Sequence, residues 1–193
     1  IYSCFAVPVI GAVFIILTGS YPNLRETVTL VSAGFLFLCV AHLVPTVASG
    51  IRPSITLLEM LPGLSIAFTI EPLGMIFACV ASFLWMVTSI YAIGYMRGHH
   101  EVNQTKFYFF FAISITAAIG VAFAGNMLTL FIFYEVLTLC TFPLVTHHGT
   151  EETKKAGRIY LGILIGTSIG FQLFAIVWTC LLYTSDAADD TCC

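Results

Sequence analysis

The sequence predicts an all-α integral membrane protein with six transmembrane helices and a short extended or hairpin element in one outer loop. The chain is 59% hydrophobic and only 9% charged, whereas soluble domains carry roughly a quarter charged residues. Six segments reach or approach the length of about 20 residues that crosses a hydrocarbon core. The polar connections between them are short, so they leave no room for a separate soluble domain.

The predicted helices cover residues 1–19, 27–49, 72–95, 107–124, 126–145 and 157–179. The first has neither an initiator Met nor a basic flank, so we expect a truncated start rather than a signal peptide. The long connection, residues 50–71, has apolar and β-branched residues on both sides of Pro62-Gly63. This pattern predicts a short hairpin on the outer face of the membrane.

Residues 180–193 are predicted to be an artefactual tail. The string from Cys180 to about Asp190 resembles a translated adaptor from a sequencing library; a natural acidic tail is the alternative. Residues 1–179 would then form one transmembrane domain, the first part of a chain that continues beyond Thr179. Without the three acids of the tail, seven basic residues face seven acidic ones, so the formal net charge of −3 does not describe that domain.

The basic residues predict the orientation. The first, third and fifth connections, with the start of the sixth helix, share one side of the membrane, and the other side carries only Arg52. By the positive-inside rule, the basic side is cytoplasmic and the N-terminus lies outside. The basic side carries Arg25, Arg97, Lys106, Lys154, Lys155 and Arg158.

The fifth predicted helix carries a single carboxylate, Glu135, near its centre. A charge there costs roughly 2.5–3.5 kcal/mol even on the mild insertion scale, so such residues mark proton or ion pathways. The alternative is a carboxyl that only holds neighbouring helices by hydrogen bonds. Thr138, one turn on, could donate its hydroxyl to Glu135, or bond its own helix backbone.

Three further features bear on a proton path. His42 in the second helix is a candidate carrier, or a hydrogen-bonded core residue. Arg158 heads the sixth helix, too far from Glu135 for a direct salt bridge; it is a candidate for a water-linked relation, or it snorkels to the surface. The small residues that follow it predict a helix-packing surface: Gly162, Gly166 and Gly170.

No cofactor, metal site or nucleic-acid partner is expected. The His99-His100 and His147-His148 pairs lie in connections, with no carboxylate or Cys partner at ligand spacing. The cysteines show no paired spacing, and those in apolar segments behave as small hydrophobes.

The stretch from Ser89 to Val145 resembles the antiporter-like, proton-translocating subunits shared by multisubunit cation/proton antiporters, respiratory complex I and membrane-bound hydrogenases. The matching marks are EPLG (71–74), YAIGYM (91–96), AGNMLTLFIFYE (124–135) and AGRIYLGIL (156–164). The resemblance implies a bundle of about fourteen helices, of which this chain supplies the first six. It implies that Glu135 pairs with a lysine of the seventh helix, which is missing here. Arg158 stands where many relatives carry lysine, and it cannot release a proton.

The sequence is most similar to the D subunit of the Mrp-like multisubunit Na⁺/H⁺ antiporter. We therefore expect a transporter subunit with no catalytic site of its own, working with other membrane subunits on protons and monovalent cations in a bacterial inner membrane. The alternative is a proton-pumping subunit of complex I, an NADH:quinone oxidoreductase, or of a hydrogenase. A self-contained six-helix receptor or channel is the competing class.

Overall fold

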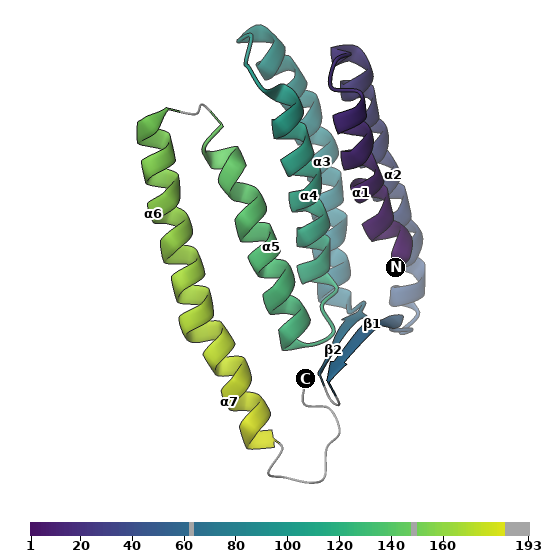
Figure 1. The fold of residues 1–193 in the computed structure, drawn as a ribbon. Helices are drawn as coiled ribbons and strands as arrows, with labels where there is room; N and C mark the ends of the chain where they lie inside the picture. Colours follow the sequence, from purple (N-terminus) through teal and green to yellow (C-terminus); the bar gives the residue numbers. More distant parts are fainter. Residues whose placement is uncertain (62–63, 148–149, 184–193) are drawn as a thin grey trace.

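The computed structural model describes residues 1–61, 64–147 and 150–183, which form six helical segments and a two-stranded sheet (Figure 1). The sixth segment continues through a π-helical turn, η1. Five segments are long and apolar enough to cross a membrane, and α1 is a shorter apolar helix, so the predicted fold class is confirmed. The elements are α1 (Tyr2–Leu17), α2 (Pro22–Ala48), β1 (Ser54–Leu61), β2 (Leu64–Thr69), α3 (Pro72–Gly98), α4 (Gln104–Ala122), α5 (Met127–Val145), α6 (Glu151–Thr167), η1 (Ser168–Leu173) and α7 (Phe174–Tyr183).

Two helices begin earlier than the hydrophobic pattern predicts. α2 begins at Pro22 rather than near residue 27, because proline suits the first helical turn, where no N–H is needed. α6 begins at Glu151 rather than near residue 157. The Thr150 hydroxyl accepts a hydrogen bond from the Thr153 N–H at its start, at 3.2 Å. Polar segments expected to be connections therefore form the first turns of helices.

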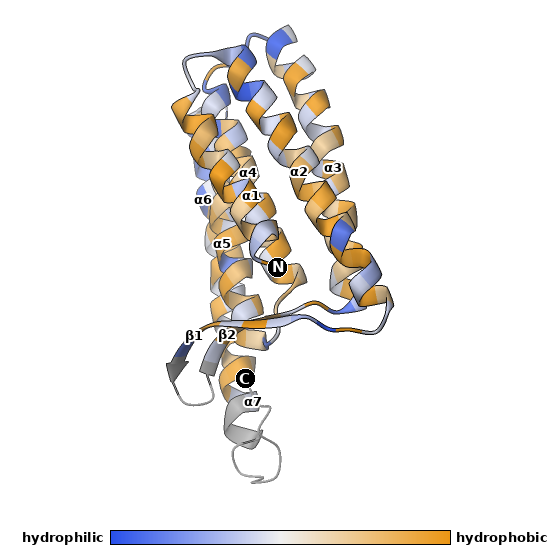
Figure 2. Ribbon diagram, turned by 90° about the vertical axis from the view of Figure 1, so that its right-hand side faces the viewer, coloured by the Kyte–Doolittle hydropathy of each residue, from blue (hydrophilic) through white to orange (hydrophobic). Residues whose placement is uncertain are grey.

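The core lies among α1, α2, α3 and α4. Figure 2 shows hydrophobic residues along the helices and hydrophilic ones concentrated near their ends. The largest fully buried side chains include Trp85 of α3 and Tyr108 of α4. Large apolar side chains elsewhere on these helices are exposed, as expected for surfaces that face lipid or other helices rather than water.

The hairpin closes one end of this bundle. β1 and β2 pair antiparallel, with Ser54 opposite Thr69, so the predicted hairpin is confirmed; its predicted Pro62-Gly63 turn lies outside the described residues. Phe68 of β2 is 1% exposed. Its ring packs between Phe5 of α1 and Phe133 of α5, with centroids at 4.7 Å and 5.3 Å.

Backbone hydrogen bonds join the hairpin to the connection between α4 and α5. The Thr69 N–H donates to the Phe123 carbonyl at 2.8 Å, and the Gly125 N–H donates to the Ala67 carbonyl at 2.9 Å. A Cβ at Gly125 would lie 2.9 Å from the Thr69 hydroxyl, so glycine allows this close approach. The hairpin and the start of α5 are therefore one unit.

Asn126 completes this unit with its side chain. Its Oδ1 accepts from the Thr129 N–H at 2.8 Å, capping α5, and its Nδ2 donates to the Ser65 carbonyl at 2.7 Å. The Thr129 hydroxyl accepts from the Ala67 N–H at 3.0 Å. These contacts give a structural role to Asn126, which lies in the segment AGNMLTLFIFYE (124–135) on which the resemblance rests.

Asn126→Ala is expected to lower the free energy of unfolding by about 1–3 kcal/mol, because the cap contributes about 1 kcal/mol and the Ser65 carbonyl also loses its donor. Asn126→Ser keeps a side-chain acceptor for the cap, places no second oxygen against the Ser65 carbonyl, and should lose less. Thermal unfolding in detergent measures both variants. Equal losses would contradict the assignment of a capping role.

The connections alternate between the two ends of the molecule. In Figure 1, the α1–α2, α3–α4 and α5–α6 connections lie at the top, and the hairpin and the α4–α5 connection at the bottom. The top end therefore carries the six basic residues named above, and Arg52 lies at the other end. The predicted alternation of loops is thus present in the fold.

Candidate functional site

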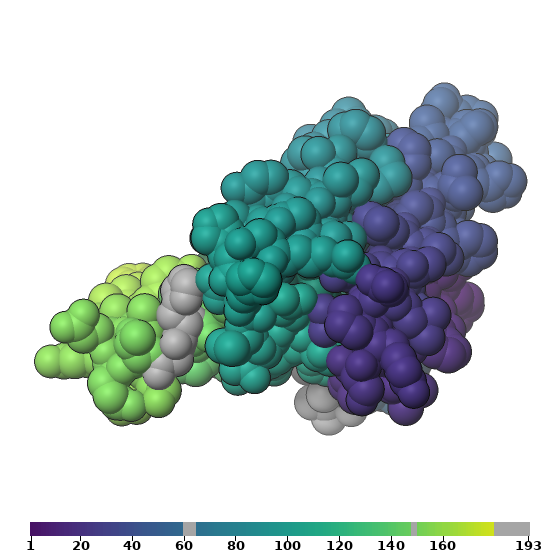
Figure 3. Space-filling model, turned by 90° about the horizontal axis from the view of Figure 1, so that it is seen from above, coloured from purple at the N-terminus to yellow at the C-terminus, as the bar shows by residue number. Residues whose placement is uncertain are grey.

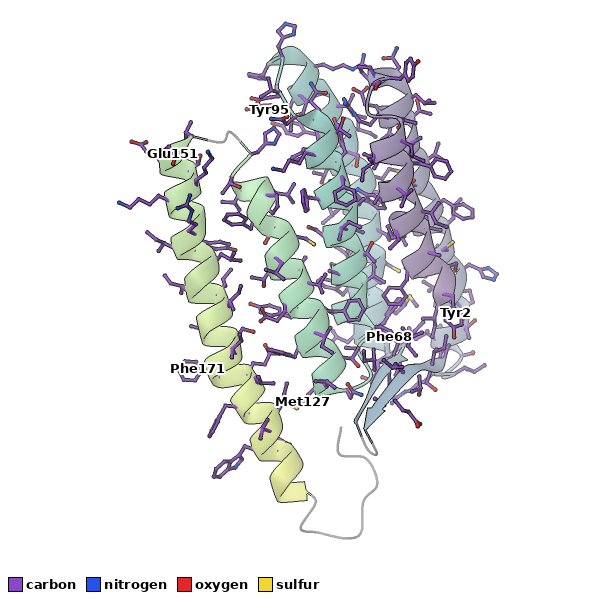
Figure 4. All side chains as sticks on the ribbon, viewed as in Figure 1. Tyr2, Phe68, Tyr95, Met127, Glu151 and Phe171 are labelled. Atoms are coloured by element: carbon purple, nitrogen blue, oxygen red, sulfur yellow. The ribbon has the colours of Figure 1, made fainter. Side chains whose placement is uncertain are left out.

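Glu135 lies midway along α5 and is half-buried. The hydroxyl of Ser168 donates a hydrogen bond to its Oε1 atom. α5 thus presents its only carboxylate to the sixth helical segment, which packs beside it (Figure 4). A membrane-embedded carboxylate and a hydroxyl from a second helix form the centre of the candidate site.

Ser168 begins the π-helical turn η1. It is 6% exposed, whereas Phe171 in the same turn is 76% exposed and points away from α5 in Figure 4. π-turns inside α-helices occur frequently at functional sites. Ser168 was not among the predicted site residues; its position opposite the predicted glycine surface was the available signal.

Thr138 is 5% exposed, on the packed face of α5. Its carbonyl accepts from the Thr141 hydroxyl at 2.9 Å. Among the described hydrogen bonds, none joins Thr138 to Glu135. The hydroxyl that bonds Glu135 is thus that of Ser168 rather than that of Thr138.

Arg158 and His42 lie apart from this centre. Arg158 is exposed on α6; Ser168, which contacts Glu135, follows 10 residues later, or about 15 Å along a helix. His42 is exposed on α2, which packs mainly against α1 and α3. The structure therefore brings Glu135 near neither residue.

The glycine surface of the sixth segment faces outward. A Cβ at Gly162, Gly166 or Gly170 would meet nothing within 4 Å in the described part of the chain, whereas one at Gly157 would lie 2.4 Å from the Thr146 side chain. Seen from above, α6 forms one edge of the molecule (Figure 3). The close helix contact within this chain is thus at Gly157.

A second polar cluster lies at the basic end and was not predicted. Glu26 is 5% exposed and Arg25 is 4% exposed. The Arg97 guanidinium donates to both carboxylate oxygens of Glu26, at 3.0 Å and 2.5 Å. This pairing joins the start of α2 to the end of α3. Pro22 at the first helical position was the sequence signal that residues 25–26 are helical.

Arg25 extends the same cluster to α4. It donates to the Thr105 hydroxyl at 2.9 Å and to the Gln104 side-chain oxygen at 2.7 Å. Its guanidinium carbon lies 5.3 Å from the centre of the Tyr108 ring, in the range of a cation–π interaction. Buried charges of this kind stabilise only when paired. The paired charges of this cluster hold the ends of α2, α3 and α4 together.

His147 acquires a carboxylate neighbour that sequence spacing did not reveal. Its Nε2 lies 4.0 Å from Glu101 in the α3–α4 connection, and its ring meets Phe107 edge-on at 5.6 Å. Within the described residues, no group of three or more His, Cys, Asp or Glu side chains is arranged to hold a metal ion.

Comparison with known proteins shows what the chain is similar to. Residues 62–108 match the family model described as NADH-ubiquinone oxidoreductase (complex I), chain 5 N-terminus. A putative antiporter subunit mnhD2 of Staphylococcus aureus is 30% identical over 58% of this chain and 21% of its own length. The chloroplastic NAD(P)H-quinone oxidoreductase subunit 5 of Chaetosphaeridium globosum is 24% identical over 69% of this chain and 21% of its own.

The predicted resemblance to antiporter-like membrane subunits is thereby confirmed. The antiporter-like chain spans about a fifth of the length of these relatives. Its fold matches a chain of the Mrp complex from Dietzia sp. DQ12-45-1b, with a TM-score of 0.74 and 19% identity over 95% of this chain and 34% of the other.

An archaeal membrane-bound sulfane sulfur reductase contains the same fold, with a TM-score of 0.74 and 17% identity over 95% of this chain and 28% of the other. The fold thus occurs in a chain of the Mrp complex and in a chain of an archaeal respiratory membrane complex. The chain is a multi-pass membrane protein that is similar to antiporter-like membrane subunits.

Proposed function

We propose that the chain belongs to a subunit of a multisubunit monovalent cation (Na⁺/K⁺)/proton antiporter, in which protons cross the membrane along a path through Glu135. The observation that carries this proposal is the placement of Glu135. It lies in the middle of α5, half-buried, and bonds to a hydroxyl of the neighbouring helix. Ionisable residues within membrane helices are costly and mark ion or proton pathways.

The partner charge must come from another part of the complete protein. The lysines of this chain, Lys106, Lys154 and Lys155, all lie at the basic end, far from Glu135. The resemblance implies a lysine on a seventh helix. In this proposal Thr138 packs beside the path, and Arg158 contributes a fixed positive charge near the basic end. His42 lies on α2, away from Glu135, and has no direct role at this site.

A respiratory role is the second candidate: a proton-pumping subunit of complex I or of a membrane-bound hydrogenase. The complex I family model and the chloroplastic relative favour it. Inverted vesicles containing the complete complex distinguish the two. In the antiporter, added Na⁺ or K⁺ dissipates an imposed proton gradient without quinone reduction. In the respiratory subunit the cations leave the gradient intact, and proton movement follows quinone reduction.

Other membrane subunits are the proposed partners. Exposed apolar side chains line α5 and the sixth segment, among them Leu139 at 51% and Ile163 at 61% exposed. The exposed glycines of α6 allow another helix to approach closely. Both observations favour assembly within a larger complex.

The proposed orientation places the N-terminus outside, because six basic residues lie at one end and one at the other. A cysteine introduced at exposed Ser54 should react with an impermeant thiol reagent added outside cells, and one at exposed Glu152 only after the cytoplasmic side is opened. The native cysteines are first replaced by serine. Labelling of Ser54→Cys from the cytoplasm alone would reverse the orientation.

A further inference from the structure

We propose that Ser168 is a positioning residue for Glu135: its hydroxyl holds one carboxylate oxygen in place, and the other oxygen interacts with the transported proton or cation. This inference rests on the proposed proton path. It gives a second helical segment, α6–η1, a role in positioning the carboxylate of Glu135. Its basis is the difference between Ser168 and its neighbour Thr167.

Hydroxyl side chains in membrane helices commonly bond a carbonyl of the preceding turn. Thr167 does so: its hydroxyl donates to the Ile163 carbonyl at 2.8 Å and the Leu164 carbonyl at 2.9 Å. Among the described hydrogen bonds, the Ser168 hydroxyl makes none to its own helix backbone. It bonds Glu135 instead, although it is the next residue along the chain.

The backbone explains the difference. α6 is α-helical to Thr167, and the π-helical turn begins at Ser168. Ser168 itself keeps α-helical dihedral angles, φ −64° and ψ −50°. One residue of an α-helix adds about 100° of rotation, so the Ser168 side chain leaves the helix on a different side from Thr167. Ser168 is consequently turned inward, 6% exposed.

A hydroxyl suits this position because it both donates and accepts. It donates to the ionised carboxylate, as seen here. When Glu135 takes up a proton, the same hydroxyl accepts from the carboxyl O–H and turns its own hydrogen toward the side-chain oxygen of Gln172, which lies 3.5 Å from it. The carboxyl group is therefore held in place in both protonation states, and Oε2, which takes part in none of the described hydrogen bonds, can meet a partner cation.

The test is cation-driven proton transport by the complete complex in inverted vesicles, at matched levels of assembled protein. Ser168→Ala should lower the rate about tenfold, because it removes a hydrogen bond to a charged group. Ser168→Thr keeps the hydroxyl and should restore most of the rate. Thr167→Ala, which removes the neighbouring hydroxyl, should behave as the unmodified protein.

A Glu135→Asp background tests whether Ser168 acts through the carboxylate. The aspartate is one methylene shorter and cannot reach the Ser168 hydroxyl, so Ser168→Ala should add little to the loss already caused by Glu135→Asp. A further tenfold loss in that background would overturn the inference, as would full activity of Ser168→Ala in a complex that Glu135→Gln inactivates. Full activity of Glu135→Gln would instead overturn the proposed proton path itself.

Discussion

Glu135→Gln is expected to abolish most proton transport while leaving assembly of the complex normal. Glutamine keeps the shape of the side chain and still accepts the Ser168 hydrogen bond, but it carries no charge. At about 4 Å and an effective dielectric constant of 20, a carboxylate–ammonium pair is worth about 4 kcal/mol. Loss of this interaction removes a bias of about a thousandfold on protonation of the partner.

Glu135→Asp provides the contrast, because it keeps the charge and shortens the reach. It should retain part of the transport. If Glu135 only holds two helices together, the ranking reverses, since glutamine still bonds Ser168 and aspartate cannot. Glu59→Gln is the matched control: it removes a carboxylate from the exposed hairpin and should leave the rate unchanged. Near-normal rates in Glu135→Gln would refute the proposed path.

Glu26→Gln is expected to lower the free energy of unfolding by about 3–5 kcal/mol, the cost of breaking a buried ion pair from one side. The carboxylate is 5% exposed and lies 3.9 Å from the buried Arg25, besides its two bonds to Arg97. Without it, the buried Arg25 guanidinium loses this opposing charge. Thermal unfolding of the purified protein in detergent measures the change.

An exposed ion pair supplies the control. Arg52 and Glu71 lie 3.6 Å apart, with side chains more than half exposed, so Glu71→Gln should change stability by less than about 1 kcal/mol. Arg97→Gln should lie between the two variants, because the Arg97 side chain is 51% exposed and water can replace part of its interaction. Similar losses for Glu26→Gln and Glu71→Gln would contradict a stabilising role for the buried cluster.

Local patterns predicted the membrane helices and the hairpin, since span length and β-branched residues around a turn signal are properties of short segments. Helix starts were predicted less well. Hydropathy alone excludes polar residues such as Arg25 and Glu26, which the fold nevertheless buries by pairing them with residues about 70–80 positions away. Packing among the helices determines these partners, and no periodic pattern in the sequence indicates them.

The candidate site was predicted in part. Glu135 stands out because a lone carboxylate in an apolar segment is conspicuous. Ser168 does not, because serine is common in membrane helices and its contact with Glu135 depends on how the sixth segment packs against α5. His147 likewise meets Glu101 only because two connections lie at the same end of the bundle.

The union of the hairpin with the start of α5 has a consequence for biogenesis. The side-chain contacts that Ala67 and Ser65 make with this helix span 62 and 61 residues of sequence. At a synthesis rate of 5–20 residues per second, β2 is therefore synthesised roughly 3–12 s before the residues at the start of α5 that bond it. During that interval its edge lacks these partners, and an unpaired strand edge is prone to join another chain. Insertion of α5 ends this exposure, so the nascent protein is most vulnerable to misassembly before the helix that carries Glu135 has entered the bilayer.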